Sequence, residues 1–201
     1  KGICDNQELE KKFKKEINPK IPFYKDFKKM ILAEKPKIVS ISTWKDSHFE
    51  ITNKCLDLGI KVIVLEKPLA NNINEAKNLI NKIKKKKARV IVNHRRRFDE
   101  DIIDLKKKLE NNLIGEIIQI SSFYVYGLLT TGTHLIDTLR MLMQNIAGDI
   151  VAVSGVKNSM KNFKPKDDKN YDASLRFKNG LLATIQNLDM KSYDNFDIHI
   201  F

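Results

Sequence analysis

The first half of the chain alternates short apolar runs with segments whose apolar residues recur at helical spacing. The runs are "KIVSIS" (residues 37–42), "KVIVL" (61–65) and "RVIV" (89–92), and their β-branched content indicates buried strands. Between the last two, an i, i+3, i+4, i+7 stripe from Ala76 to Ile83 predicts an amphipathic helix. Continuous apolar strands that alternate with such helices predict a parallel sheet covered on both faces.

Other signals predict where further elements begin. Residues 2–4 are expected to form a strand, followed by a polar helix over 7–17. A second helix is expected to begin near Asp26. Ser47-x-x-Glu50 has the spacing of a capping box, which predicts a helix that begins at Ser47.

The second half has a different pattern, in which long apolar or alternating segments predict strands. These segments are "GEIIQISSFYVY" (115–126), "GDIVAVSGV" (148–156), "YDASLRF" (171–177) and "GLLATIQNLDM" (180–190). The turn residues Lys178-Asn179-Gly180 predict a hairpin between the last two. Helices are expected over 100–111 and 133–144, and residues 158–169 are the best candidate for a mobile loop.

These patterns predict an α/β protein with two domains. Residues 1–95 are expected to form a Rossmann-type parallel-sheet domain that binds a dinucleotide. Residues 96–201 are expected to form an α+β domain with a large mixed or antiparallel sheet.

Composition fits this picture and excludes several other classes. The chain has 201 residues, 42% hydrophobic and 31% charged, which is enough for one large or two small globular domains. It has two cysteines and no CxxC motif, so neither a disulfide framework nor a metal site is predicted. Without an apolar run of eighteen residues or a secretory signal, we expect a soluble cytoplasmic protein with no membrane partner.

The formal net charge of +12 raises the alternative of a nucleic-acid-binding module. The lysine runs, such as Lys84 to Lys87, fall on outward helix faces, and no aromatic residues interleave with them as stacking platforms. We therefore predict no nucleic-acid partner. The alternative would show itself in a steep salt dependence of binding.

Polar residues follow each predicted strand of the first domain. They are Asp5, Ser42-Thr43-Trp44, Glu66-Lys67-Pro68 and Asn93-His94. Ligands of open parallel sheets bind just beyond these carboxyl ends. An acid there can accept hydrogen bonds from both ribose hydroxyls and repel a 2′-phosphate, so Asp5 favours NAD over NADP; its alternative role is a helix N-cap.

The Glu66-Lys67-Pro68 triplet has two interpretations. A lysine at a strand end, with a proline that fixes the turn, can hold its ammonium over a ligand and polarise a hydroxyl or carbonyl oxygen. The same triplet would also suit an ordinary surface turn.

The ordered set of motifs resembles the Gfo/Idh/MocA family of NAD(P)-dependent oxidoreductases over almost the whole chain. The most specific parts are Thr43 with His48 five residues on, the Glu66-Lys67-Pro68 triplet after a strand, Arg96-Arg97-Phe98-Asp99, and His134-x-x-Asp137. The resemblance implies that Lys67 and His134 are the catalytic pair, and that the Lys67–Pro68 bond is cis. It also implies a cofactor site of Asp5, Ser42, Thr43, Trp44, His48, Glu66, Lys67 and Asn93, and a substrate site of Lys67, Thr130, His134 and Asp137.

The sequence departs from the family pattern in three ways. The family's glycine-rich phosphate loop would stand before Asp5, and Phe201 falls inside an apparent strand, so we expect segments to be missing from both ends. Thr130 stands where many members have an aspartate, four residues before the histidine. A threonine hydroxyl can hydrogen-bond a substrate but cannot share charge with His134.

The resemblance implies an NAD-dependent dehydrogenase or reductase that acts on a secondary alcohol or ketone of a sugar, cyclitol or sugar nucleotide. A basic surface near the cleft would favour an anionic substrate. The family also implies a homodimer or homotetramer packed through the C-terminal sheet. The main alternative is a cofactor-sensing regulator of the same fold that binds a protein partner without turnover.

Overall fold

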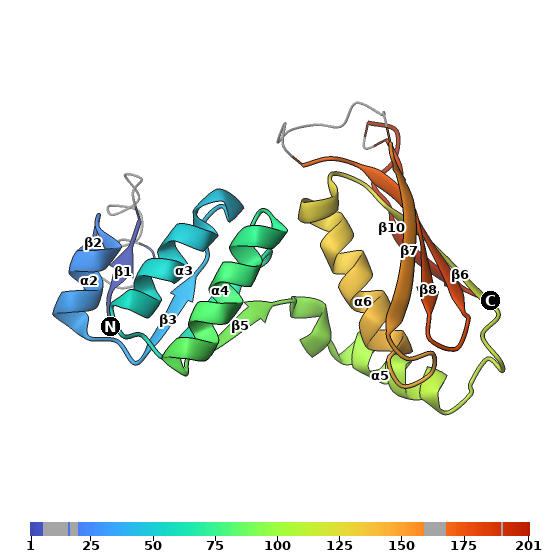
Figure 1. Ribbon diagram of the computed structural model, residues 1–201, viewed down its shortest axis with the longest axis horizontal. Coiled ribbons are helices and arrows are strands. Elements are labelled where there is room, and N and C mark those ends of the chain that lie inside the picture. The colour runs from blue at the N-terminus through green and yellow to red at the C-terminus, as the bar shows by residue number, and fades with distance from the viewer. Residues whose placement is uncertain (6–15, 17–19, 159–167, 190) are drawn as a thin grey trace. The chain divides into compact units, whose positions relative to one another are not determined.

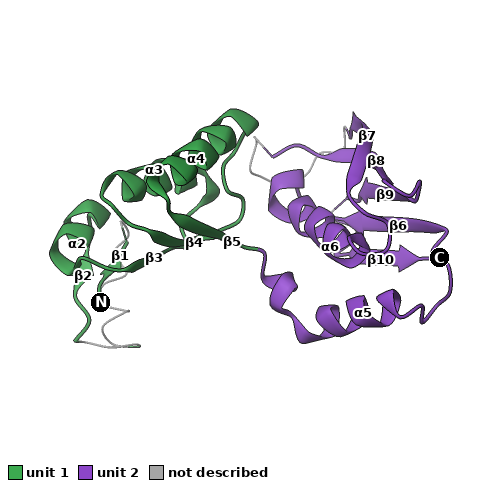
Figure 2. Cartoon of the chain, turned by 60° about the horizontal axis from the view of Figure 1, so that its bottom comes forward, with its two compact units in different colours: residues 1–93 green, residues 94–201 purple. Residues whose placement is uncertain are grey.

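The computed structural model describes residues 1–5, 16, 20–158, 168–189 and 191–201 (Figure 1). The predicted helix over 7–17 and most of the predicted loop over 158–169 lie outside these described residues. The chain divides into two compact units, residues 1–93 and 94–201 (Figure 2). The elements of the first unit are β1 (Ile3–Cys4), β2 (Phe23–Tyr24), α2 (Phe27–Glu34), β3 (Ile38–Ile41), η1 (Lys45–Ser47), α3 (His48–Asp57), β4 (Val62–Glu66), α4 (Ile73–Lys86) and β5 (Arg89–Asn93). Those of the second unit are η2 (Arg95–Phe98), α5 (Glu100–Glu110), β6 (Gln119–Tyr124), η3 (Leu128–Gly132), α6 (Thr133–Met143), β7 (Ile150–Lys157), β8 (Tyr171–Phe177), β9 (Leu182–Asn187) and β10 (Phe196–Ile200).

The first unit contains the predicted parallel strands. β3, β4 and β5 pair in parallel in that order, with Ile38 opposite Val62 and Val62 opposite Arg89. β1 and β2 form a separate parallel pair. α3 and α4 lie side by side on one face of the three-stranded sheet (Figures 1 and 2). The predicted parallel α/β class is confirmed.

The core of the first unit lies between this sheet and the two helices. Ile63 and Leu65 of β4 are fully buried against Leu56 of α3 and Leu79 of α4. Alternate strand residues point to the opposite face, where Ile38 is 60% exposed. The expected cover on both faces is therefore found on one face only within the described residues.

Two details of the predicted helices are wrong. Ile80, part of the predicted buried stripe, is 42% exposed, because α4 meets the core through a narrower stripe centred on Leu79. Ser47 stands before α3 but makes no side-chain cap, so the capping box is not formed. Its backbone is already helical because η1 precedes it, and an N-cap requires an extended backbone.

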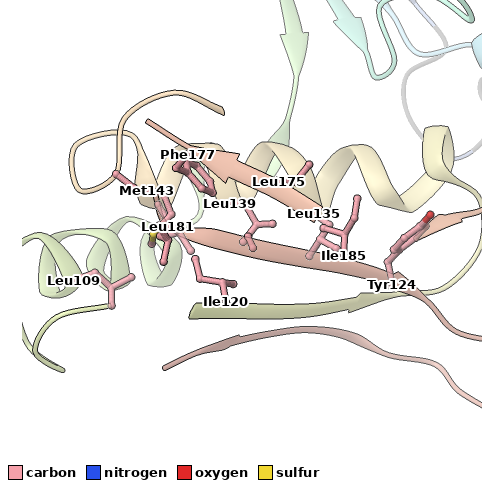
Figure 3. Close-up of a cluster of buried hydrophobic side chains, with 13 residues drawn as sticks. Leu109, Ile120, Tyr124, Leu135, Leu139, Met143, Leu175, Phe177, Leu181 and Ile185 are labelled. Carbon is pink, nitrogen blue, oxygen red and sulfur yellow. The ribbon is translucent and has the colours of Figure 1, made fainter. Parts of the chain in front are cut away.

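The second unit is built on a five-stranded mixed sheet with the order β10-β6-β9-β8-β7. Only β6 and β9 pair in parallel; the other neighbours are antiparallel. α6 packs on one face, and its Leu135, Leu139 and Met143 lie over strand residues such as Ile120 and Ile185 (Figure 3). The mixed sheet was predicted, and the hairpin at Gly180 joins β8 and β9 as expected.

The segment before α6 differs from the prediction. α6 begins at Thr133 as expected, but a short π-helix, η3, continues it backward to Leu128. Its residues, Leu-Leu-Thr-Thr-Gly, contain weak helix formers, which is why the sequence pattern gave no helix there. The helical segment that carries Thr130 and His134 therefore begins five residues earlier than predicted.

Candidate functional site

Several predicted cofactor residues of the first unit line one cavity. This cavity has a volume of about 1460 Å³, and its wall includes Asp5, Ser42, Thr43 and Trp44. The Trp44 side chain is 81% exposed. Asp5 follows β1 and the other three follow β3, so strand ends from two different ladders meet at this cavity.

The other two strand ends of this unit are joined to each other. Glu66 ends β4 and Asn93 ends β5, and Asn93 Nδ2 donates a hydrogen bond of 2.5 Å to Glu66 Oε1. Lys67 follows Glu66 and is half-buried, and the Lys67–Pro68 bond is cis, as the resemblance implied. The amide therefore fixes the carboxylate next to Lys67.

His48 lies inside the same unit and does not face solvent. Its side chain is 1% exposed. Nδ1 lies 2.7 Å from the Pro68 carbonyl oxygen, and Nε2 lies 2.9 Å from the Thr43 carbonyl oxygen. The Ser47 hydroxyl is 2.7 Å from that of Thr43, which further orders the turn after β3. His48 thus connects the turn after β3 to the turn after β4.

In the second unit, Asp137 of α6 forms an ion pair with Arg97 of η2. Arg97 Nη2 donates to Asp137 Oδ1 at 2.7 Å and Arg97 Nε donates to Asp137 Oδ2 at 2.8 Å. This hydrogen bonding raises the pKa of the Arg97 guanidinium. Two parallel bonds of this kind fix both position and orientation of the carboxylate.

Two histidines lie beside this ion pair. His94 Nδ1 is 3.6 Å from Asp137 Oδ2. The rings of His94 and His134 meet edge to face, with centroids 6.1 Å apart. These contacts form one cluster of four side chains. His94 directly precedes η2 and Arg97 lies within it, whereas His134 and Asp137 lie in the first two turns of α6.

Thr130 lies at a different contact of the second unit. The Leu129 and Thr130 N–H groups each donate to the Asp168 carboxylate at 2.7 Å, and the Thr130 hydroxyl donates to it at 2.5 Å. Asp168 is 8% exposed and closely covers Gly127, where any Cβ would overlap its carboxyl group. The carboxylate thus satisfies backbone donors at the start of the helical segment that carries His134.

The structure groups the predicted residues within each unit. Asp5, Ser42, Thr43 and Trp44 share the cavity, and Glu66 and Asn93 are bonded together. Lys67 belongs to the first unit, whereas Thr130, His134 and Asp137 belong to the second. The second unit also uses His94, Arg97 and Asp168, to which the sequence assigned no role.

The missed residues differ in how well the sequence signalled them. His94 and Arg97 stand in the strand-end segment "NHRRRFD", which was already a candidate region. Asp168 had no local signal, because it is 38 residues from Thr130 and only packing brings them together.

The part of the chain that the structure describes contains neither a metal-binding group nor a membrane-spanning helix. None of its His, Cys, Asp and Glu side chains gather into a group able to hold a metal ion. Across the same residues, no helix has the length and apolar character needed to span a bilayer.

Comparison with known proteins gives a family match for the first unit and relatives for both units. Residues 1–94 match the Gfo/Idh/MocA model, described as an oxidoreductase family with an NAD-binding Rossmann fold. The uncharacterized oxidoreductase YhhX of Escherichia coli is 29% identical over 89% of this chain and 55% of its own length. Myo-inositol 2-dehydrogenase of Thermotoga maritima is 27% identical over 82% of this chain and 53% of its own length. The chain thus spans about half the length of these curated relatives.

A solved structure shows the same fold across both units. The crystal structure of myo-inositol 2-dehydrogenase from Lactobacillus plantarum matches with a TM-score of 0.79 at 19% identity. The match covers 100% of this chain and 65% of that chain. The first unit therefore matches the family model of the Gfo/Idh/MocA oxidoreductases, and the chain shares the fold of this solved structure.

Proposed function

We propose that this protein is an NAD(P)-dependent dehydrogenase or reductase that interconverts a secondary alcohol and a ketone. The observation that carries the proposal is the cavity along β1 and β3 of the first unit, whose wall includes Asp5, Ser42, Thr43 and Trp44 just beyond the ends of these strands. Polar groups at the carboxyl ends of parallel strands are where this class of fold binds dinucleotides.

The residues at this cavity fit a nicotinamide dinucleotide. Asp5 offers a carboxylate for ribose hydroxyls, and the exposed Trp44 ring offers an apolar surface. The hydroxyls of Ser42 and Thr43 add hydrogen-bonding groups. When bound, the nicotinamide supplies the hydride donor or acceptor.

We assign the proton-transfer chemistry to Lys67 and His134. The Lys67 ammonium would polarise the reacting oxygen of the substrate, with the neighbouring Glu66 fixed by Asn93. His134 would take the hydroxyl proton, because a neutral imidazole accepts a proton near working pH. Lys67 is half-buried at the end of β4.

Thr130 and Asp137 are assigned to the substrate side of the second unit. The Asp137 carboxylate is held by Arg97, so we assign it mainly to fixing the start of α6. Thr130 is fixed by Asp168 and would contact the substrate through its side chain. The second unit would therefore bind substrate, and the open face of its sheet would form a homodimer or homotetramer.

The substrate class proposed is a sugar, a cyclitol or a sugar nucleotide. Two matched relatives carry the name inositol 2-dehydrogenase/D-chiro-inositol 3-dehydrogenase, and another the name myo-inositol 2-dehydrogenase. The net charge of +12 favours an anionic member of that class.

The first test is a titration of the protein with NADH and, separately, with NADPH. Nicotinamide fluorescence is the signal that reports binding. We expect saturable NADH binding and weaker NADPH binding, because the Asp5 carboxylate repels a 2′-phosphate. Asp5→Asn should narrow the difference between the two affinities, and Asp104→Asn, on α5 of the second unit, is the control. Tighter binding of NADPH than of NADH would overturn the role of Asp5. NADH binding without turnover of any polyol or sugar nucleotide would favour the regulator instead.

The second test is the catalytic role of His134. We expect His134→Ala to lower kcat at least about a hundredfold while NADH affinity stays the same, as for loss of a general base. Lys107→Ala is the control, because Lys107 lies at an exposed position of α5. An unchanged kcat in His134→Ala would remove His134 from the mechanism.

A further inference from the structure

His48 has an unusual set of partners for a buried histidine. Both ring nitrogens lie at hydrogen-bond distance from backbone carbonyl oxygens, 2.7 Å from that of Pro68 and 2.9 Å from that of Thr43. The ring is 1% exposed, so water does not compete for either nitrogen. Both partners are acceptors only.

A neutral imidazole cannot satisfy two acceptors. It has one N–H donor and one nitrogen lone pair. In either neutral tautomer, the lone pair would face a carbonyl oxygen at hydrogen-bond distance, and the contact would be repulsive. An imidazolium donates from both nitrogens and satisfies both carbonyls.

We propose that His48 is protonated on both ring nitrogens and acts as a cationic clamp between the turns after β3 and β4. Thr43 belongs to the turn after β3, and Pro68 directly follows Lys67 at the end of β4. The clamp therefore makes His48 a positioning residue for Lys67. The clamp itself stands independently, whereas its consequence for catalysis rests on the proposed oxidoreductase function.

The charged groups beside His48 in η1 are paired with each other. Asp46 lies there, directly before α3, and its carboxylate, which is 72% exposed, forms an ion pair with Lys45 Nζ at 2.9 Å. Asn71 Nδ2 donates to the same carboxylate at 2.9 Å. The stabilisation of the proposed buried cation therefore comes from hydrogen bonds to the Pro68 and Thr43 carbonyl oxygens.

The same hydrogen bonds affect how His48 can contribute to cofactor binding. The resemblance implied that His48 lines the dinucleotide. Its two nitrogens are instead both engaged by backbone carbonyls within the first unit. Its contribution to the cofactor site is therefore the placement of Thr43 and of the Lys67 turn.

The protonation state can be measured directly by nitrogen NMR of histidine-labelled protein at about pH 7, close to the ordinary histidine titration range. The chain has 4 histidines, and the His48 signals are those missing from His48→Gln. We expect both ring nitrogens of His48 to show protonated shifts and couplings. A non-protonated nitrogen on the His48 ring would overturn the clamp. If His48→Gln does not fold, the His94→Gln, His134→Gln and His199→Gln spectra identify His48 by elimination.

The positioning role is tested by kinetics on the same variant. Glutamine keeps one donor but presents an oxygen in place of the other, so it cannot donate to both carbonyls. We expect His48→Gln to lower kcat about tenfold or more, with NADH affinity unchanged, because Lys67 is misplaced. Lys107→Gln, at an exposed position of α5, is the control, with kcat expected at the wild-type value. A protonated His48 with an unchanged kcat in His48→Gln would keep the clamp and overturn its role in placing Lys67.

Discussion

Gly127 shows how closely one residue of the second unit is constrained. It directly precedes η3, and the Asp168 carboxyl group occupies the space where a Cβ would lie. Asp168 reaches this place to accept hydrogen bonds from the Leu129 and Thr130 N–H groups. The absence of a side chain at position 127 is therefore what lets the carboxylate reach the start of the helical segment.

We expect Gly127→Ala to lower the free energy of unfolding by about 1–3 kcal/mol, the usual cost of overpacking a buried site. The measurement is urea unfolding at equilibrium. Asp168→Ala removes the obstructing group, so the methyl group at position 127 should cost much less in the double variant Gly127→Ala/Asp168→Ala. Strictly additive losses would show that Asp168 does not cover Gly127.

Single residues of the site were predictable where a strand end placed them. Asp5, Thr43 and Glu66 each follow an apolar run, so the sheet alone predicts that they gather near the carboxyl ends of strands. Asp168 was not predictable, because its contact with Thr130 depends on tertiary packing across 38 residues. The partners of His48 were not predictable either, because they are backbone carbonyl oxygens that tertiary packing brings to the ring.

At the scale of elements, two helices begin with a side chain that caps their first backbone N–H groups. Asp26 is the N-cap of α2, and its carboxylate accepts hydrogen bonds from the Lys28 and Lys29 N–H groups. These backbone hydrogen bonds lower the pKa of Asp26 from its ordinary value of 3.8. Asn72 caps α4 in the same way but cannot titrate.

The Asp26 cap gives α2 a pH dependence of known sign. Because the pKa is lower in the folded state, the stabilisation is present above the unfolded value and is lost as pH falls through the folded value. We expect the free energy of unfolding to fall less steeply in Asp26→Asn as pH falls below the ordinary value of 3.8, because asparagine caps without titrating. Asp194→Asn, in the exposed turn before β10, is the control. Equal slopes for wild-type and Asp26→Asn would contradict the prediction.

The elements themselves were largely predictable, whereas their ends were not. "YDASLRF" is β8 residue for residue, because alternation and the following turn bound it on both sides. The strand predicted from residue 115 begins instead at Gln119, because the apolar pattern continues through Ile118, which is 78% exposed and bonds to Phe201, beyond the end of β10. A periodic pattern predicts which face of an element is buried more reliably than it predicts the first and last residues of that element.

At the scale of the whole molecule, one face of the second unit's sheet has no helix over it within the described residues. α6 covers the face that carries Ile120 and Ile185. Gln186 points to the opposite face and pairs with Phe123, which lies 5.8 Å from the ring of His199. We propose this open face as the contact between subunits.

A charge on that face should weaken self-association. In a two-fold dimer each new positive charge faces its copy or its neighbours, and like charges across an interface repel. We expect Gln186→Arg to raise the dimer dissociation constant at least about tenfold, measured by sedimentation at several concentrations. Gln144→Arg, an exposed position at the end of α6, is the matched control. Equal dissociation constants would place the contact elsewhere.

The strand order of the second unit has a consequence for synthesis of the chain. β6 comes first in the sequence of this sheet but lies between β9 and β10, so its Ser122 bonds to the Thr184 carbonyl across 62 residues. Contacts of such long range close late and slowly, whereas β3, β4 and β5 pair with near neighbours. On the ribosome the first unit can complete its ladder while β6 still lacks both partners. Until β10 emerges, β6 is the strand most open to pairing with another nascent chain.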